Sequence, residues 1–383
     1  MLNSIRIKGF RKYKDFALDG FSNINFILGD NNVGKTSILE SVFAWACGQN
    51  AVPFINIPLA RGRYSGIQQP YWVMEELLAT VNDRKTLPLR MTFEGNDAGK
   101  RVCFEHLIYP SELLGDYDSS YKNRISRTRP QSNEISPRDI PVYTNVIQNP
   151  FQIPQTLIAR WDIKYNGGKP LSSEIVLPFT MAPTIRPYQI SKFIDVLSHT
   201  SVAENVQIYA SLKREKLLDE LTSEIRKIFP EILGFDMIPY PDGSQSPVSV
   251  IKEKQLLPLY ACGDGVQRWF YILGAMVLYK NSIMCIDEID TGMHPEAQVE
   301  FSRNLIKSSM RNNVQLFITT HNIEFLDHFL KALNSSIIEN DYNDRANLIK
   351  IITVKDLKEG PKARVFNSEE ATRVRSDFNL ELR

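Results

Sequence analysis

The start of the chain shows two different patterns of apolar residues. Residues 5 to 8 alternate between isoleucine and a basic side chain, which is typical of a strand with one buried face. Residues 24 to 28 read Ile-Asn-Phe-Ile-Leu, a short apolar run typical of a buried strand. The residues that follow a turn recur at helical spacing: Ile38, Leu39, Val42 and Phe43. We therefore predict strands, a turn and then a helix.

Strands and helices are also predicted to alternate in the second half of the chain. Residues 282–288 form an apolar strand that ends in two acids, and residues 314–318 form another. A helix with Pro295 in its first turn is predicted between them, since proline is tolerated there. An earlier helix presents one apolar stripe: Val266, Trp269, Phe270, Leu273, Met276 and Val277. Such alternation predicts an α/β fold with a mixed sheet.

The middle of the chain has a different character. Four segments rich in alternating or β-branched residues are predicted to be strands: 87–94, 102–109, 156–165 and 173–180. Residues 188–229 are predicted to be helical, and residues 241–249 form a Pro/Ser/Gly-rich link. We expect three parts: an N-terminal half of a head over 1–110, an inserted strand and helical region over 111–240, and a C-terminal half over 241–383.

The turn after the second strand carries the first candidate chemistry. Gly29 to Thr36 match the phosphate-binding pattern G-x-x-x-x-G-K-[ST], between a strand and a helix as that motif requires. Glycines let the backbone wrap a phosphate, and successive N–H groups with the helix N-terminus form an anion nest. Lys35 would reach the β- and γ-phosphates, and Thr36 would hold Mg²⁺. The candidate nucleotide-binding residues are Gly29, Asn31, Asn32, Val33, Gly34, Lys35, Thr36 and Ser37.

Two acids and a histidine follow later strands. Asp287 and Glu288 end an apolar strand, at the edge of an open sheet where ligands bind. Asp287 suits the Mg²⁺ shell, and Glu288 suits polarisation of an attacking water. His321 comes after the next strand and could donate a hydrogen bond to the γ-phosphate. Together with Lys35 these two side chains, Glu288 and His321, are the catalytic candidates.

A second glycine-bearing helix start precedes the acidic strand. Residues 262–268 read Cys-Gly-Asp-Gly-Val-Gln-Arg, with Gly263 and Gly265 at the beginning of the predicted helix. A helix N-terminus of this kind binds anions. Because one chain needs only one such end for each nucleotide, we expect this end to cap the ATP of a second protomer.

The order of these motifs resembles the ABC-type ATPases of the RecF/SMC/OLD branch. The opening Ile5 to Lys12 looks like that branch's Ile-x-Asn-Phe-Arg start, and the Gly-Asp-Gly-x-Gln-Arg segment looks most like AAA15/OLD-like bacterial ATPases, such as the ATPase subunit of the PARIS phage-defence system. The likeness covers roughly residues 1–48 and 256–330.

The resemblance implies an ABC-type P-loop ATPase head that dimerises with two ATP molecules and Mg²⁺ between the protomers. Lys35, Thr36, Asp287, Glu288 and His321 would act in cis, and Gly265 with its neighbour Gly263 would act in trans. Asp290 would lie at the dimer seam. Arg11 or Lys12 would touch the nucleotide.

Two departures from the family pattern affect this expectation. Gly263 occupies the place where a serine usually bonds the γ-phosphate, so capping would rely on backbone N–H groups and turnover would be slow. The glutamine that usually follows the P-loop strand has several candidates: Gln68, Gln69, Gln152 and Gln155.

Composition narrows the class of protein. In 383 residues, hydrophobic residues make up 43% and charged ones 23%, which indicates an ordered globular protein. A formal charge of +1 excludes a uniformly basic protein that coats DNA. The longest apolar run, residues 269–279, is too short to cross a membrane, and four widely spaced cysteines fit a reducing interior. We expect a cytoplasmic protein.

Two functions remain open at this point. The first is an ATP-controlled switch in antiviral defence that governs a separately encoded nuclease or toxin, since too few residues follow His321 for an attached nuclease domain. The alternative is a RecF-like repair ATPase that binds DNA without an effector, for which the polar, partly basic residues 116–139 are the candidate contact. A small-molecule kinase is disfavoured, because it needs neither the paired acids nor a trans helix end.

Overall fold

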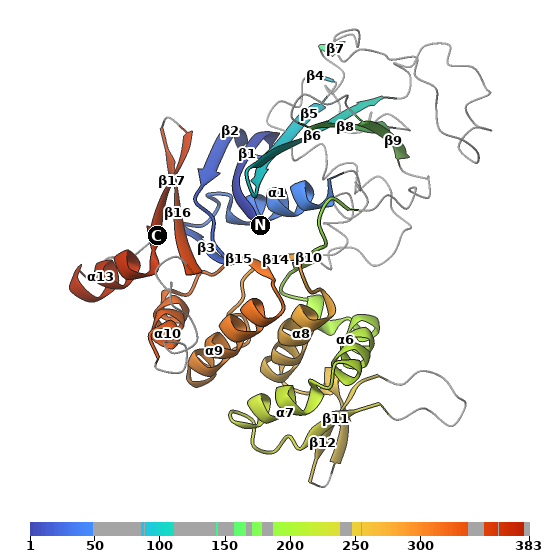
Figure 1. The fold of residues 1–383 in the computed structure, drawn as a ribbon, viewed down its shortest axis with the longest axis vertical. Coiled ribbons are helices and arrows are strands. Elements are labelled where there is room, and N and C mark those ends of the chain that lie inside the picture. Colours follow the sequence, from blue (N-terminus) through green and yellow to red (C-terminus); the bar gives the residue numbers. More distant parts are fainter. Residues whose placement is uncertain are drawn as a thin grey trace, which may run out of the picture.

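The fold of the chain is given by a computed structural model. It describes residues 1–48, 86–87, 89–110, 143–144, 157–165, 171–177, 187–237, 247–253, 255–335, 348–358 and 360–378. Within these ranges the strands form two six-stranded sheets and two smaller ones, and the helices lie between and below the larger sheets (Figure 1).

One large sheet carries the nucleotide motifs. Its strands, in spatial order, are β10 (Ser191–Ile194), β14 (Ile283–Ile286), β15 (Gln315–Thr319), β3 (Ile24–Gly29), β16 (Ile349–Leu357) and β17 (Gly360–Asn367). Neighbours from β10 to β16 are parallel, and β17 is antiparallel. The predicted α/β fold with a mixed sheet is confirmed, and strands after His321 complete the sheet.

The other large sheet is antiparallel throughout. Its order is β2 (Tyr13–Asp19), β1 (Leu2–Phe10), β5 (Leu89–Asp97), β6 (Lys100–Pro110), β8 (Leu157–Tyr165) and β9 (Leu171–Leu177). The four strands predicted in the middle of the chain are confirmed with shifted ends. The smaller sheets comprise β11 (Gly234–Asp236), β12 (Ser249–Lys252) and β13 (Gln255–Pro258), and the pair β4 (Thr86–Leu87) and β7 (Tyr143–Thr144).

The helix that follows the P-loop lies between the two large sheets. All residues of α1 (Lys35–Cys47) except Thr36 are buried, because the helix is covered on both sides. Its apolar side chains share a core with Ile5, Ile7 and Phe93 of the antiparallel sheet and with Phe317 of the parallel one. Apolar residues on several sides of α1 suit this position, and the buried acid Glu40 forms an ion pair with Arg11.

The remaining helices lie on the other side of the parallel sheet from α1, and α7 packs on α8 (Figure 1). They are η2 (Ser198–Thr200), α6 (Val202–Arg214), α7 (Leu218–Arg226), η3 (Leu259–Ala261), α8 (Asp264–Leu278), α9 (Pro295–Arg311), α10 (Ile323–Leu333) and α13 (Ser368–Phe378). The stripe of α6 and α7, with Leu212, Leu221 and Ile225, is buried in this second core, so it serves packing. None of the helices in the described ranges is long and apolar enough to cross a membrane.

One secondary-structure prediction was wrong. Residues 188–229 were expected to be helical throughout, but β10 forms the edge of the nucleotide sheet and pairs in parallel with β14. The reason is tertiary: Phe193 and Ile194 are buried against elements that lie far along the chain. The segment expected to be an insertion thus contributes a strand to the head. The basic residues 116–139 and the four candidate glutamines lie outside the described residues.

Candidate active site

The P-loop is positioned by a buried strand and by close backbone contacts. Every residue of β3 is buried, and its last residue, Gly29, pairs with Val354 of β16. A Cβ atom at Gly29 would lie 2.3 Å from the carbonyl oxygen of Val354, and φ is +145°. Glycine is therefore required at this position by the neighbouring strand, in addition to the room that a phosphate needs.

The P-loop lysine closes the loop on itself. Lys35 Nζ donates hydrogen bonds to the carbonyl oxygens of Gly29 and Asp30, at 2.8 and 2.9 Å. These contacts place the ammonium group inside the turn, where a phosphate bound to the loop would meet it. Asn32, with φ +64°, and Gly34, with φ +97°, supply the left-handed backbone of an anion nest.

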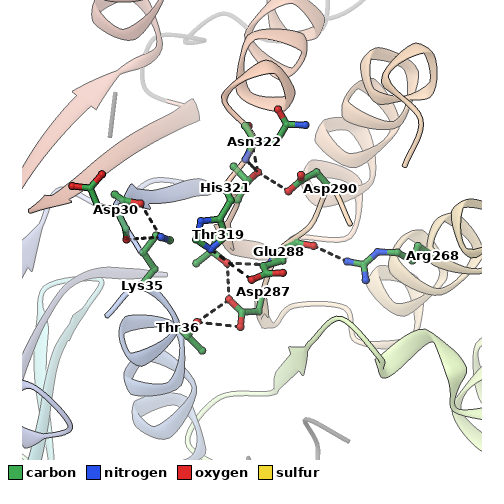
Figure 2. A network of polar contacts seen from close by, with 12 residues as sticks. Asp30, Lys35, Thr36, Arg268, Asp287, Glu288, Asp290, Thr319, His321 and Asn322 are labelled. Atoms are coloured by element: carbon green, nitrogen blue, oxygen red, sulfur yellow. Dashed lines mark hydrogen bonds and ion pairs between the residues drawn. The ribbon is translucent and has the colours of Figure 1, made fainter. Parts of the chain in front are cut away.

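The predicted metal-binding residues come together. Thr36 Oγ1 lies 3.1 Å from each carboxylate oxygen of Asp287, although the two residues are 251 positions apart (Figure 2). Asp287 is buried, and its Oδ1 also accepts a hydrogen bond of 2.6 Å from Thr319 Oγ1. A hydroxyl and a carboxylate are oxygen ligands of the kind that Mg²⁺ prefers, so the residues present fit this ion.

The two other catalytic candidates face each other. His321 Nε2 lies 3.6 Å from Glu288 Oε1, and both side chains are nearly half exposed. Glu288 has φ +49°, a left-handed conformation that is costly for a non-glycine residue and often found at active sites. Its backbone N–H donates to Thr319 Oγ1, so one hydroxyl fixes both Asp287 and Glu288.

The N-terminus of α8, the second glycine-bearing helix start, has different surroundings from the N-terminus of α1. Gly263 is the N-cap of α8 with no side-chain cap, and a Cβ there would have nothing within 4 Å. Behind it, Gly265 packs near Phe229 and the carbonyl of Gly292. Asp264, in the first turn, is 67% exposed and lies 3.7 Å from His199 Nε2. The front of this helix end is therefore open.

A buried arginine joins α8 to the paired acids. Arg268 is 1% exposed and donates to the carbonyl oxygens of Val196, Glu288 and Ile289, at 3.0, 3.0 and 3.4 Å. Burial lowers the pKa of its guanidinium, and nearby acids, first among them Asp290, oppose that change. Arg268 and Lys35 lie on opposite sides of the acids in Figure 2.

Two predicted residues have contacts that the sequence did not indicate. Arg11 forms an ion pair with Glu40, a buried acid of α1, with 2.9 Å between Arg11 Nη2 and Glu40 Oε1. Asp290 Oδ1 accepts a hydrogen bond of 2.5 Å from Thr320 Oγ1. Their expected roles at the nucleotide and at the dimer seam stay predictions.

Sequence reasoning missed Tyr13 and Thr319, and it did not foresee the contacts of Arg268. Lys12 was a candidate contact of the nucleotide, and that role stays a prediction. Lys12 Nζ donates to the Asn32 carbonyl at 2.9 Å, and Tyr13 OH lies 3.2 and 3.1 Å from the carbonyl oxygens of Val33 and Gly34. His321 was identified from the sequence, but the position of the Thr319 hydroxyl next to Asp287 and Glu288 depends on the pairing of β14 with β15.

Known families match both ends of this site. Residues 1–44 match the family described as "AAA ATPase domain", and residues 195–327 match the one described as "AAA domain, putative AbiEii toxin, Type IV TA system". The first segment contains the P-loop, and the second contains the paired acids and His321. Over both segments the chain is similar to AAA domains, and the description of the first names an ATPase. Hydrolysis of ATP is consistent with both family matches and with the arrangement of Lys35, Thr36, Asp287 and Glu288.

Individual relatives match different shares of this chain. A Helicobacter pylori protein named "ATP/GTP phosphatase" is 24% identical over 366 residues, which are 91% of each chain. The DNA replication and repair protein RecF of Oenococcus oeni is 45% identical over 42 residues, 11% of each chain. The structure of an Smc head bound to the C-winged helix domain of ScpA is 14% identical and covers 97% of this chain and 99% of that one, with a TM-score of 0.46.

Proposed function

We propose that the chain is a slow ATP-controlled switch in which two copies close around ATP and hydrolysis reopens them. The observation that carries this proposal is the open N-terminus of α8. Gly263 has free space in front of it, while Arg268 and Gly265 hold the helix from behind. A helix end of this kind binds an anion. The P-loop already supplies one such end within the chain, so the second one is suited to a partner's nucleotide.

Within one protomer, different residues would bind the phosphates, hold Mg²⁺ and activate the attacking water. The N–H groups of the P-loop and Lys35 would bind the phosphates, and Thr36 with Asp287 would hold Mg²⁺, which neutralises charge as the phosphoryl group transfers. Glu288 would accept a proton from the attacking water. His321, 3.6 Å from Glu288, would donate to the γ-phosphate side of the same site.

Across the dimer, the partner copy would complete the site. The N–H groups at Gly263 and Gly265 would cap the γ-phosphate, and Asp290 would lie at the seam. Because Gly263 offers no hydroxyl, the cap depends on backbone donors, which fits slow turnover.

The output of the switch is proposed to be a separately encoded effector in antiviral defence, with the chain in the cytoplasm and in the OLD-like branch. Support comes from the motif order, and from the family match whose description names an AbiEii toxin and a type IV toxin–antitoxin system. The near-neutral charge also favours a protein partner over nucleic acid.

The dimer is tested with a Glu288→Gln variant, which should bind ATP without hydrolysing it. Light scattering after gel filtration should give a monomer without nucleotide and a dimer with Mg·ATP, and Lys35→Ala should stay monomeric in both. A Glu288→Gln protein that is saturated with ATP and still monomeric would overturn the proposal. Effector control is tested by expression with the neighbouring genes: growth arrest or nuclease activity that is unchanged by Glu288→Gln argues against it.

The RecF-like alternative is favoured by one observation, the local identity of 45% to RecF over 42 residues. It predicts ATP-dependent DNA binding that weakens steeply with salt. Charge reversal of Arg124, Arg127 and Arg129, in the segment outside the described residues, should then abolish binding. Unchanged DNA affinity in that variant excludes this route.

A further inference from the structure

The turn between β1 and β2 lies against the outside of the P-loop. It is formed by Arg11 and Lys12, with Arg11 in a left-handed conformation at φ +50°. From it Lys12 and Tyr13 reach three consecutive carbonyl oxygens of the P-loop, those of Asn32, Val33 and Gly34. We name this pair, Lys12 and Tyr13, the outer brace.

These carbonyl contacts determine where the neighbouring N–H groups point. A peptide group is planar and trans, so its C=O and N–H point in opposite directions. Holding the carbonyls of Asn32, Val33 and Gly34 toward the outer brace turns the N–H groups of Val33, Gly34 and Lys35 to the other side. That side is the concave face of the loop, where a phosphate nest needs its donors.

Tyr13 is well placed to serve as a fixed donor. The residue is 0% exposed and its ring stacks on Phe16, with 4.6 Å between the ring centroids. Burial raises the pKa of its hydroxyl, with a smaller contribution from Asp356, so the group keeps its proton. A hydroxyl has a single proton, which the two carbonyls at 3.2 and 3.1 Å share.

The absence of a side chain at Gly34 makes this contact possible. A Cβ atom at Gly34 would lie 2.6 Å from the Tyr13 oxygen and 2.9 Å from Lys12 Cδ. The second glycine of the motif thus leaves room for the outer brace on the outside of the loop, as well as adopting φ +97°.

The outer brace is itself anchored to the sheet. Lys12 Nζ forms an ion pair of 2.7 Å with Asp356 of β16, the strand that pairs with β3. Arg11 is tied to Glu40 of α1. The turn is thus fixed on both sides of the P-loop, at the strand and at the helix.

We infer that Tyr13, with Lys12, is a positioning residue that orders the P-loop N–H groups for the triphosphate before it binds. This inference rests on the proposed ATP site and concerns the first step, binding to one protomer. Neither residue needs to touch the nucleotide for this role, since both act through the carbonyl side of the loop.

The test is Tyr13→Phe, which keeps the ring and deletes the hydroxyl. We expect the Kd for Mg·ATP and the KM to rise roughly tenfold, because the Val33 carbonyl loses the hydroxyl donor, the Gly34 carbonyl keeps only the Ile38 N–H, and the loop must order on binding. Because chemistry uses other residues, kcat should change by less than about twofold. Hydrogen exchange at the amides of residues 33–35 should become faster in the nucleotide-free protein.

The matched control is Tyr209→Phe, which removes a hydroxyl that bonds Asp236 at 2.9 Å on the other side of the molecule. It should change KM by less than about twofold whatever it does to thermal stability. If Tyr13→Phe behaves like this control, with an unchanged Kd and unchanged exchange, the inference is wrong. Should Tyr13→Phe fail to fold, Lys12→Met tests the same inference through the Asn32 carbonyl, and an unchanged Kd in that variant overturns it. Wild-type protein that binds no ATP would instead refute the proposed function, so the two failures are distinguishable.

Discussion

In the part of the chain that the structure describes, α1 and α8 both begin at a glycine, and their N-termini have different surroundings. At the start of α1, Lys35, the outer brace and the Thr36–Asp287 contact complete an anion site within one molecule. At the start of α8, the residues that hold the helix lie behind it, and the first turn carries the exposed carboxylate of Asp264.

In the proposed switch, this difference predicts that binding of ATP to one protomer is the strong step and that closure of the dimer is the weak one. A cation faces the phosphate at α1, whereas an anion lies in the first turn at α8 and competes for the same helix dipole. Binding to one protomer is therefore expected to be tight, and closure of the dimer is expected to be the marginal step. A marginal step is the one that a partner can control most easily.

The largest effect on ATP affinity is expected when the P-loop lysine at the start of α1 is removed. Lys35→Ala removes the charge that meets the phosphates, and Mg·ATP affinity should fall at least about 100-fold, which corresponds to roughly 3 kcal/mol. Titration calorimetry measures this directly. As a control, Lys280→Ala deletes a surface lysine that pairs with Glu215 and should leave affinity unchanged. Wild-type affinity in Lys35→Ala would remove the α1 site from the mechanism.

A smaller effect, on ATP-dependent dimerisation, is expected when a bulky acidic side chain is placed at the N-terminus of α8. Gly263→Glu fits the open space there and places a second carboxylate at the helix end. ATP binding to the monomer should be unchanged, while ATP-dependent dimerisation, measured by sedimentation, weakens by about 2 kcal/mol, roughly thirtyfold.

The opposite change at this position sharpens the comparison. Gly263→Ser supplies a side-chain cap and the hydroxyl of the usual family pattern, so it should dimerise at least as well as wild type. If both variants at position 263 give dimerisation constants equal to that of wild type in sedimentation experiments, α8 does not face a partner.

The support behind α8 is tested by Gly292→Ala. This glycine has φ +75°, and a Cβ would lie 3.0 Å from Cβ of Asp264. The free energy of unfolding should fall by about 1–2 kcal/mol in urea titrations. Gly99→Ala, with φ +85° and nothing within 4 Å, is the control for backbone strain alone and should lose less. Equal losses would mean that the contact with Asp264 contributes nothing.

The smallest effect concerns His106 of β6, in the antiparallel sheet that packs on α1. Burial lowers the pKa of His106 from 6.5 to about 4, so the folded state binds fewer protons than the unfolded state below pH 6.5. The contribution of His106 to the free energy of unfolding is therefore fully present above about pH 6.5. It is lost as the pH falls toward 4. Between pH 8 and pH 6 the loss from this group should be about 0.8 kcal/mol. His106→Gln should show a correspondingly flatter profile of unfolding free energy, and an identical profile would contradict the assignment.

The central residues of the candidate site could be predicted from the sequence, because they belong to motifs with fixed spacing. The P-loop and the acids after β14 follow from local residue order, and parallel strand ends bring Thr36 to Asp287. The contacts of Tyr13 could not be predicted in this way, since they join residues 20 and 21 positions apart through the stacking of two sheets. Arg268 was recognised only as part of a motif, because nothing in the stripe of α8 shows that its charge is buried.

The fold was predictable where patterns are long and failed where an element is short. The alternation in β5 and β6 and the apolar stripe of α8 indicated the correct type of element. The four residues of β10 carry too little pattern, and their identity as a strand depends on pairing with β14, about ninety positions later.

The place of β3 in its sheet has a consequence for how the molecule is made. This strand, which ends in the P-loop, lies between β15 and β16, and both come from the last third of the chain. A ribosome therefore releases the apolar β3 long before its neighbours exist, and the pocket for triphosphate cannot take its final form until Val354 has left the exit tunnel. We therefore expect nascent chains to lack a complete nucleotide site and to expose an unpaired apolar strand, the kind of segment that chaperones bind.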